Sequence, residues 1–530
     1  MSVPSMPLPL LLPLALGALL LVGARLPLSV QRFIGLLGTL CVLAAALDLL
    51  ALTAQGDVLA TAIGGWPPPF GIVLVCDRLS ALMLTLTGLL GTAALFYASS
   101  GGADASGRHF HALFQFQLFG LVGAFLTGDL FNLFVFFEVL LIASYGLLMH
   151  GGGPARTRAA LHYVVLNLVG SSLFLLGAAL IYAATGTLNL ADLAVRLGQL
   201  TPADARLAGA GGLLLFTVFA LKAALPPLHA WMVPAYAAAS APVAALFAIL
   251  TKVGLYAMLR LLSLVPDTGS GSAFVGSATW LLTGAAVLTI TAGTLGALAS
   301  TRLGTMIGYL VMLSMGTLLA GIAPGTAQGL AAALYYLVHT TLITAGLFLL
   351  ADLIASGRAQ GDRLVIGDPP RDARILAPLF LLGAIAIAGL PPLSGFLGKA
   401  WILIAVQDSA ATGPAVWPWI WVAVLGSSFV VLLGLSRAGT LLLWRRRGAV
   451  SPGARANPDG GRSGLARPAL VGTSALLAAS PLLMLFAGPL TGFTLATARQ
   501  ILDNGEYVAA VAGLAPQSHA SDAREEGTDR

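Results

Sequence analysis

Charged residues and cysteine are scarce in this 530-residue sequence. Only 9% of its residues are charged, whereas 58% are hydrophobic and the mean hydropathy is +0.92, which excludes a soluble domain. The two cysteines, Cys41 and Cys76, have no CxxC spacing, so we expect neither a disulfide framework nor a metal site. The glycines at 151–153 follow no strand and indicate no phosphate site, and no pattern indicates another cofactor.

Apolar runs of about 20 residues, the length needed to cross a membrane as a helix, recur along nearly the whole chain. They do not alternate in polarity as the strands of a membrane barrel would. We therefore predict an all-α integral membrane protein with about fourteen transmembrane helices. The predicted spans lie at roughly 7–24, 30–53, 72–98, 109–127, 129–149, 161–184, 207–228, 238–262, 275–297, 302–322, 327–354, 374–406, 417–444 and 468–490.

Most arginines lie in every second loop between the predicted spans. These loops contain Arg25 and Arg32; Arg108; Arg156 and Arg158; Arg302; Arg358, Arg363, Arg371 and Arg374; and Arg445, Arg446, Arg447, Arg455, Arg462 and Arg467. The intervening loops are mostly free of arginine, except the one with Arg196 and Arg206. The positive-inside rule places the arginine loops in the cytoplasm and both termini outside. The net charge of +6 therefore does not indicate nucleic-acid binding.

Lysine occurs at only three positions, Lys222, Lys252 and Lys399, and all three lie inside apolar runs. A charge at the bilayer centre costs about 2.5–3.5 kcal/mol on insertion scales. Arginine stays charged there, whereas a desolvated lysine can lose its proton near neutral pH. Three lysines at membrane depth therefore indicate a use for a removable proton.

The motif LPPL occurs at residues 225–228 and again at 390–393, each time inside a long apolar run. Proline removes a helix hydrogen bond and clashes with the carbonyl four residues earlier, which belongs to Lys222 for Pro226 and to Ile387 for Pro391. We therefore predict broken helices at Pro226 and Pro391. Broken helices at matching places in two halves are typical of a transport path in repeat-built transporters.

Glu138 is one of only four glutamates and lies about 13 Å into its predicted helix, near the middle of a core about 30 Å thick. Its natural partner is Lys222, because a proton gained by one group changes the proton affinity of the other. The alternatives are a glutamate that serves helix packing or assembly, and a lysine that reaches the membrane surface. Intramembrane acids are functional by default, so we favour the pair.

Lys252 and His339 should lie near the midplane, since they fall about ten and twelve residues into their spans. Histidine titrates near neutrality, although a single membrane histidine can also be a hydrogen-bonded packing residue. Lys399 would be the distal member of the series, and His229, just after the first LPPL, is a further candidate. Asp77 and Arg78 begin the third span and are expected to pair or to cap the helix. The acid, the three lysines and the histidines together form a candidate proton relay.

At these residues the chain resembles the proton-pumping, antiporter-like subunits shared by Mrp-type cation/proton antiporters, NADH:quinone oxidoreductase and membrane-bound hydrogenases. The stretches GDLFNLFVFFEVLLIASYGLL and KAALPPLHAWMVPAYAAASAPVAALFAILTKVGLY are most similar to the D-type subunits of Mrp-type multisubunit Na+/H+ antiporters, and LPPLSGFLGKAWIL matches the family's second broken helix. The resemblance implies an essential pair at Glu138 and Lys222. It also implies a relay continued by residues Lys252, His339 and Lys399.

The resemblance further implies two inverted five-helix repeats and obligatory partner subunits in a hetero-oligomer of the bacterial inner membrane. We expect a three-helix segment at 1–108, the first repeat at 109–262, the second at 275–444, a cytoplasmic loop with the last transmembrane helix at 445–490, and a flexible tail at 491–530.

The expected function is that of an ion-translocating, proton-conducting subunit of a multisubunit monovalent cation/proton antiporter, which is a secondary transporter and not an enzyme. One alternative is a proton-pumping subunit of a redox complex, either a quinone oxidoreductase or a hydrogenase. Another is a non-conducting scaffold; a stand-alone solute carrier is disfavoured because no cluster of pocket-lining aromatic and polar residues is evident. The sequence leaves open whether the cation is Na+, K+ or Li+, and whether it crosses this subunit or a neighbour.

Overall fold

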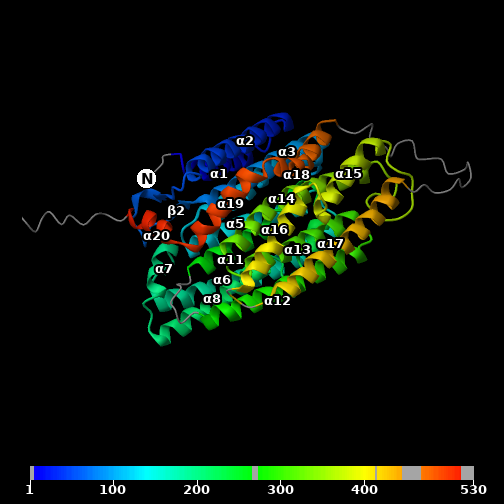
Figure 1. Ribbon diagram of the computed structural model, residues 1–530. Helices are drawn as coiled ribbons and strands as arrows, with labels where there is room; N and C mark the ends of the chain where they lie inside the picture. The colour runs from blue at the N-terminus through cyan, green and yellow to red at the C-terminus, as the bar shows by residue number, and fades with distance from the viewer. Residues whose placement is uncertain (1–4, 265–271, 412, 414, 445–466, 515–530) are drawn as a thin grey trace, which may run out of the picture.

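The computed structural model describes residues 5–264, 272–411, 413, 415–444 and 467–514. Within these residues the chain forms a bundle of long, roughly parallel and antiparallel helices, with one small two-stranded sheet at one end (Figure 1).

The N-terminal part holds three helices and the sheet. They are α1 (Leu8–Val22), α2 (Leu28–Thr53), β1 (Leu59–Ala62), β2 (Val73–Cys76) and α3 (Arg78–Gly101), with the short 3₁₀ turns Ile63–Gly65 and Ala103–Ser106. The strands pair antiparallel, with Leu59 opposite Cys76. Asp77 caps α3, because its carboxylate accepts a hydrogen bond from the backbone N–H of Ser80. Arg78 instead donates to the carbonyl of Ala54, so Asp77 and Arg78 do not pair with each other.

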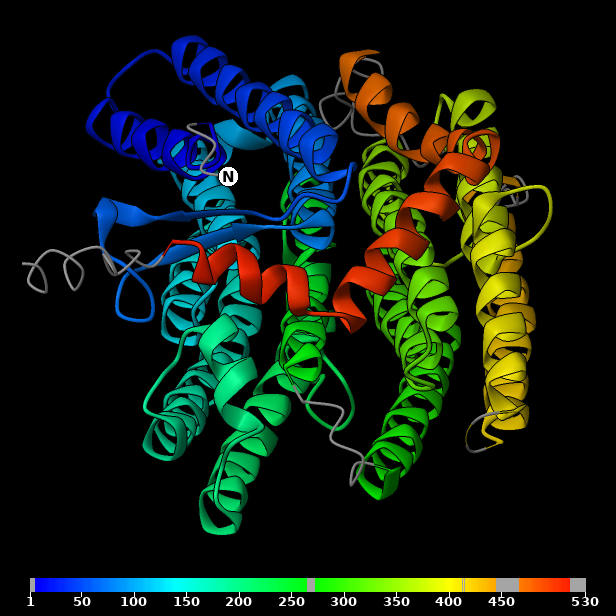
Figure 2. The ribbon, with the colours of Figure 1, turned by 60° about the vertical axis from the view of Figure 1, so that its left-hand side comes forward.

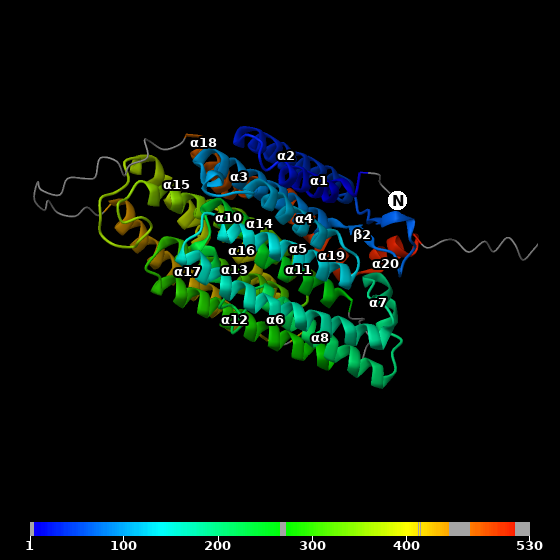
Figure 3. The same ribbon diagram turned by 180° about the vertical axis from the view of Figure 1, so that it is seen from behind.

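The first half of the remaining bundle contains eight helical segments. They are α4 (Phe110–Leu126), α5 (Leu130–Met149), α6 (Pro154–Thr185), α7 (Leu190–Leu197), α8 (Pro202–Lys222), α9 (Met232–Ala238), α10 (Ala241–Phe247) and α11 (Leu250–Ser263). Figure 3 shows α6 and α8 side by side along one outer edge of the bundle.

The second half continues in the same style and ends in a C-terminal segment. Its helices are α12 (Ser272–Ala299), α13 (Leu303–Ile322), α14 (Ala327–Ser356), α15 (Ala373–Ala388), α16 (Ser394–Asp408), the 3₁₀ turn Ser409–Ala411, α17 (Trp417–Gly439) with the π turn Thr440–Trp444, α18 (Arg467–Leu485), α19 (Ala487–Leu502) and α20 (Gly505–Ala512). Helix α14 is buried along nearly its whole length and packs against α10, α13, α16, α18 and α19, so it is the centre of the bundle.

Eleven helices among the described residues are long and apolar enough to cross a membrane, and three shorter apolar helices accompany them at Leu8–Val22, Phe110–Leu126 and Ala373–Ala388. Their positions follow the predicted spans. The all-α membrane fold predicted from the sequence is therefore confirmed.

Both LPPL motifs interrupt their helices. Helix α8 ends at Lys222 and α9 begins at Met232, and α15 ends at Ala388 while α16 begins at Ser394. The prolines remove backbone donors at both places, and the chain crosses each gap in turns. The predicted span 374–406 is thus two helices that meet at a break.

The C-terminal part differs from the expected flexible tail, because residues 491–512 lie largely in the helices α19 and α20. Burial explains the difference: Thr494, Ala498 and Ile501 of α19 are covered by the bundle, and Tyr507 of α20 is buried as well. In Figure 2, α19 runs obliquely across the bundle and α20 reaches the strands. Residues 515–530 and the predicted cytoplasmic loop at 445–466 lie outside the described residues.

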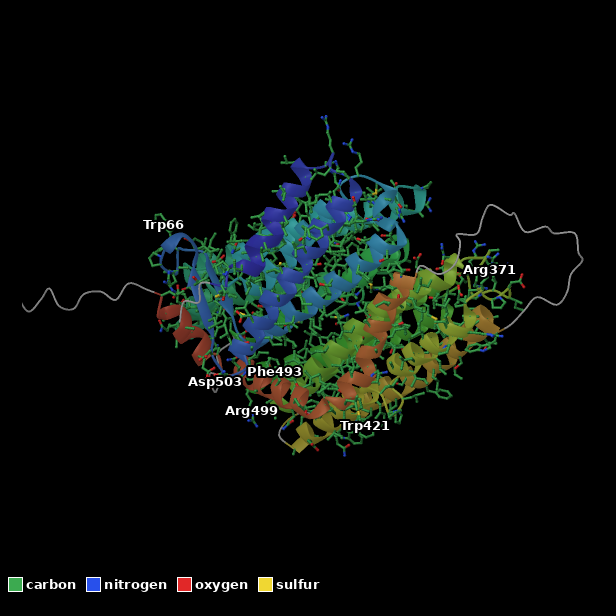
Figure 4. The ribbon with its side chains drawn as sticks, turned by 90° about the horizontal axis from the view of Figure 1, so that it is seen from above. Trp66, Arg371, Trp421, Phe493, Arg499 and Asp503 are labelled. Atoms are coloured by element: carbon green, nitrogen blue, oxygen red, sulfur yellow. The ribbon has the colours of Figure 1, made fainter. Side chains whose placement is uncertain are left out.

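The two ends of the bundle differ in the segments they carry. One end holds the strands, α7 and α20, and we call it the hairpin end. The opposite end holds the connection between α14 and α15, and we call it the arginine end. Figure 4 shows Trp66 of the strand connection at the hairpin end and Arg371 at the arginine end. Arg302 pairs there with Asp362, which joins two of the predicted arginine loops.

Candidate proton-relay site

Glu138 lies in the middle of α5 and is half-buried. Its carboxylate accepts a hydrogen bond from the hydroxyl of Ser171 on the neighbouring helix α6. Phe131, Val135 and Ile142 on the same helix are exposed large apolar side chains. The carboxylate therefore sits at the edge of the bundle rather than at its centre.

Lys222 is the last residue of α8, directly before the first break, and only 7% of it is exposed. Its ammonium donates a hydrogen bond of 3.1 Å to the side-chain oxygen of Asn167 and lies 5.7 Å from the ring centre of Phe137. The part of the chain that the structure describes shows no ion pair between a lysine and a carboxylate within 4.0 Å. Lys222 is therefore held by an amide and an aromatic ring.

Helix α6 connects Glu138 with Lys222. Asn167 and Ser171 are four residues apart, so they share one face of α6. Ser171 faces the carboxylate of Glu138, and Asn167 faces the ammonium of Lys222. Glu138 and Lys222 thus each contact a side chain on one face of a third helix, and the Ser171 hydroxyl lies 3.0 Å from the backbone carbonyl of Asn167.

A small cavity of about 20 Å³ adjoins Lys222 and has room for about one water molecule. Asn167, Tyr163 and Trp231 line it together with Leu250 and Val253 of α11. The rings of Tyr163 and Trp231 stack at 4.9 Å, and the indole N–H of Trp231 donates to the carbonyl of Leu221. The cavity therefore extends from the end of α8 toward the helix that carries Lys252.

Lys252 on α11 is completely buried and donates a weak hydrogen bond of 3.4 Å to the hydroxyl of Thr251. Gly254 brings α11 close to the end of α8, because a Cβ atom at Gly254 would lie 2.5 Å from the backbone nitrogen of Ala223. Only glycine permits this contact. The close approach places the helix of Lys252 against the end of α8, where Lys222 lies.

His339 on α14 is also completely buried. Its Nδ1 atom lies 2.7 Å from the hydroxyl of Ser394, the first residue of α16, and that hydroxyl lies 2.9 Å from the hydroxyl of Ser480 on α18. The Nε2 atom of His339 is buried and has no hydrogen-bond partner within the described residues. The imidazole is thus fixed on one side and has an unused nitrogen on the other.

Lys399 on α16 is 5% exposed, and its ammonium binds the second broken helix. It donates to the carbonyls of Ile387 at 3.2 Å and Ala388 at 3.0 Å, and to the hydroxyl of Ser428 at 2.9 Å. Pro391 and Pro392 cannot donate to these two carbonyls, which lie four residues before them. Lys399 therefore supplies the hydrogen bonds that the double proline removes.

His229 lies in the turns between α8 and α9 and is half-buried. Its Nδ1 atom has no hydrogen-bond partner among the described residues. No hydrogen bond between described residues links His229 to Lys222, nor Lys252 to His339. The structure thus brings Glu138 and Lys222 to one face of α6 and fixes His339 and Lys399 at the second break, while His229 stands apart.

The sequence did not single out Ser171, Ser394, Ser428 and Ser480. Serine is common in membrane helices, so its presence carries little signal. Spacing would have helped for Ser171, since it follows Asn167 by four residues. The remaining serines come from helices distant in sequence, and only the packing brings them to His339 and Lys399.

Within the described residues no group of three or more His, Cys, Asp or Glu side chains is placed to hold a metal ion. The candidate site offers three amines, imidazoles, one carboxylate and the hydroxyls near them. These groups bind and release protons.

A family model described as NADH:quinone oxidoreductase/Mrp antiporter, TM, matches residues 127–430, more than half of the chain and all of the proposed relay. The chain belongs to this family. Among its relatives, a probable K(+)/H(+) antiporter D subunit from Rhizobium meliloti (strain 1021) is 44% identical in an alignment 467 residues long that covers 82% of this chain and 86% of the relative. The Na(+)/H(+) antiporter D subunit from Bacillus subtilis (strain 168) is 37% identical over 396 residues, 74% of this chain and 78% of the relative.

Solved structures of family members show the same fold. A chain of the Mrp complex from Dietzia sp. DQ12-45-1b is 28% identical and gives a TM-score of 0.82. The match covers 96% of this chain and 99% of the Mrp chain. A chain of an archaeal membrane-bound sulfane sulfur reductase is 27% identical and gives a TM-score of 0.83. The match covers 96% of this chain and 99% of the reductase chain. A chain of respiratory complex I from Thermus thermophilus is 28% identical and gives a TM-score of 0.75. The match covers 94% of this chain and 100% of the complex I chain.

Proposed function

We propose that this chain is the proton-carrying, ion-translocating subunit of a multisubunit monovalent cation/proton antiporter. The observation that carries the proposal is the connection of Glu138 to Lys222 through Ser171 and Asn167 at membrane depth. The names of the relatives support the same function, since they are D subunits of Na(+)/H(+) and K(+)/H(+) antiporters. The chain is in this proposal a transporter subunit and not an enzyme.

The proposed relay runs from Glu138 and Lys222 through Lys252 and His339 to Lys399. The cavity between Lys222 and α11 supports the first step, because a water molecule there would bring the ammonium of Lys222 toward the helix of Lys252. The unused Nε2 atom of His339 supports the later steps, since a neutral imidazole with a free nitrogen can take up a proton. An ion gradient drives transfer, with about 2.3 kcal/mol per charge per 100 mV. His229 stands outside the proposed relay.

The half-buried position of Glu138 among exposed apolar side chains supports partner subunits on that face. We propose that a cation or proton approaching in a partner changes the charge state of Glu138 and, through α6, the proton affinity of Lys222. The proposed orientation places the arginine end in the cytoplasm of a bacterium and both termini outside. Which cation is exchanged is decided by the partners or by the path, and the experiment below is run with Na+, K+ and Li+ in turn.

The test replaces Glu138 by glutamine in the assembled complex, in membrane vesicles. Cation-dependent dissipation of an imposed pH gradient is measured for each cation. We expect the Glu138→Gln variant to lose exchange while its subunits still co-purify, because glutamine keeps the shape but cannot bind and release a proton. The matched control is Asp408→Asn, which changes an exposed carboxylate at the end of α16 and should leave exchange unchanged. Unchanged exchange in Glu138→Gln would exclude the proposed function.

The likeness to chains of the sulfane sulfur reductase and of complex I supports a second candidate, a proton-pumping subunit of a redox complex. The same relay would serve both functions, so variants within this chain do not separate them. Mass spectrometry of the subunits that co-purify does separate them. Partners with iron–sulfur motifs favour the redox complex, and membrane subunits without redox centres favour the antiporter.

A further inference from the structure

A line of buried polar residues runs along one face of α11 from Lys252 to the hairpin end. Lys252, Tyr256 and Arg260 follow each other at intervals of four residues and are 0%, 3% and 8% exposed. Residues four apart share a helix face, and each step covers about 6 Å along the axis. The line therefore spans about 12 Å between the midplane lysine and the end of the helix.

Tyr256 is the middle member of this line, and its hydroxyl contacts three other residues. Its hydroxyl donates to the carbonyl of Phe125 at 2.8 Å, accepts from Nε of Arg260 at 3.0 Å and lies 3.1 Å from the hydroxyl of Ser80. Phe125 belongs to the last turn of α4, where carbonyls lack a partner within the helix. Tyr256 thus continues the polar line from the middle of α11 toward Arg260.

Arg260 ends the line in an ion pair with Asp77. Two hydrogen bonds of 2.6 Å join its guanidinium to the two carboxylate oxygens, and Ser80 accepts a further one at 2.9 Å. Burial by itself would raise the pKa of Asp77, but the charge and hydrogen bonds of Arg260 hold it below its usual value. Asp77 is therefore ionised beside the guanidinium of Arg260.

Beyond the ion pair lies a cavity of about 10 Å³, nearly the room of one water molecule. Asp77 and Arg260 line it together with Gln500, Asn504 and Tyr507 of the C-terminal segment. Asn504 donates to the carbonyl of Ser263 at 2.8 Å. The ring of Tyr507 lies 5.4 Å from the guanidinium, and its buried hydroxyl has no hydrogen-bond partner among the described residues.

We propose that the Asp77–Arg260 ion pair is a gate that closes a polar route between Lys252 and the hairpin end, with the end of α19 and α20 as its cover. The inference rests on the proposed role of Lys252 as a proton carrier. A buried ion pair is weak evidence for stability, since well-packed apolar residues often serve as well or better. An arginine at the end of a proton route has a specific effect, because its fixed positive charge repels protons and it cannot pass one on.

In the closed state seen here, Arg260 separates Lys252 and Tyr256 from the outer cavity. Release of Arg260 from Asp77 would join the hydroxyls of Tyr256 and Ser80 to water in that cavity. The lysines and Arg260 thus have different roles in the proposed route. The three lysines give up protons and carry them, whereas Arg260 does not give up its proton and blocks the route.

The test measures how fast an imposed pH gradient decays in vesicles that contain the assembled complex, without any exchangeable cation. The Asp77→Asn variant removes the charge that holds Arg260 in place. We expect decay about tenfold faster than in the unmodified complex, which corresponds to a barrier lowered by about 1.4 kcal/mol. The matched control is Asp192→Asn, which breaks the half-exposed pair with Arg196 at the same end and should leave the decay unchanged.

A second variant tests whether the leak passes Lys252. The double change Asp77→Asn and Lys252→Leu should return the decay to the unmodified rate, because the carrier is removed. An equal leak in the single and double variants would overturn the proposal, since the route would then bypass Lys252. The result of the Glu138→Gln experiment does not depend on this outcome, so the proposed gate can be overturned while the proposed function stands.

Asp77→Asn leaves Arg260 as an unpaired buried charge, which can prevent assembly. The double variant Asp77→Asn with Arg260→Gln leaves no unpaired buried charge, so it tests the proposal even when the single variant does not assemble. The gate predicts a faster decay in this variant as well. A purely structural pair predicts a lower thermal stability with the decay unchanged, and this outcome would overturn the proposal.

Discussion

The hydroxyl of Ser171 faces the carboxylate of Glu138 and also lies 3.0 Å from the backbone carbonyl of Asn167. A serine hydroxyl has one proton, so it donates to one of these acceptors at a time. When Glu138 is ionised, the carboxylate is the stronger acceptor. When Glu138 is protonated, Ser171 can turn to Asn167, whose side chain holds Lys222. In the proposed relay, this turn of the Ser171 hydroxyl is the step that would carry the charge state of Glu138 to Asn167, the residue that binds Lys222.

Replacement of Ser171 by alanine should weaken this connection. A hydrogen bond to a charged group contributes about 1.5–3 kcal/mol, so we expect exchange to fall about tenfold or more. Exchange is measured as cation-dependent dissipation of a pH gradient. Ser172→Ala is the matched control, because Ser172 is exposed and donates only to the carbonyl of Leu168. Equal effects of the two substitutions would exclude a specific role for Ser171.

Replacement of Lys399 by arginine tests whether the lysine must lose its proton. Arginine keeps the positive charge and can still donate to the carbonyls of Ile387 and Ala388, but it does not deprotonate. We expect the complex to assemble with nearly unchanged thermal stability and to lose exchange. The reverse change at a half-exposed site, Arg196→Lys, is the control and should have no effect. Exchange that persists in Lys399→Arg would show that the ammonium only holds the broken helix.

Gly395 packs against the relay and should not tolerate a side chain. A Cβ atom there would overlap the carbonyl oxygen of Ala386 and would lie 2.7 Å from Nε2 of His339. Overpacking of this kind costs about 1–3 kcal/mol or more, so Gly395→Ala should lower both the melting temperature and the exchange rate. Gly426→Ala is the control, because a Cβ at Gly426 meets open space. A stable and active Gly395→Ala complex would show that α15 and α16 can separate freely at the break.

The positions of the apolar spans, the broken helices and the buried amines could all be read from the sequence. Each of these depends on local composition: length sets the membrane span, proline removes a helix donor, and three lysines stand out in apolar runs. The family resemblance rested on the same stretches around Glu138, Lys222 and Lys399. The helical C-terminal segment could not be read in this way, because Gln500, Asn504 and Tyr507 pack on residues that lie hundreds of positions earlier.

The partners of the charged residues were decided by the tertiary structure alone. The sequence paired Glu138 directly with Lys222, and the structure places Ser171 and Asn167 of α6 between them. The sequence expected Asp77 to pair with its neighbour or to cap its helix; the structure shows the cap and pairs Asp77 with Arg260, 183 residues away. Composition decides which groups enter the membrane, because solvation of each residue is a local cost. Packing decides which groups meet, because hydrogen bonds form only at distances that helices set when they assemble.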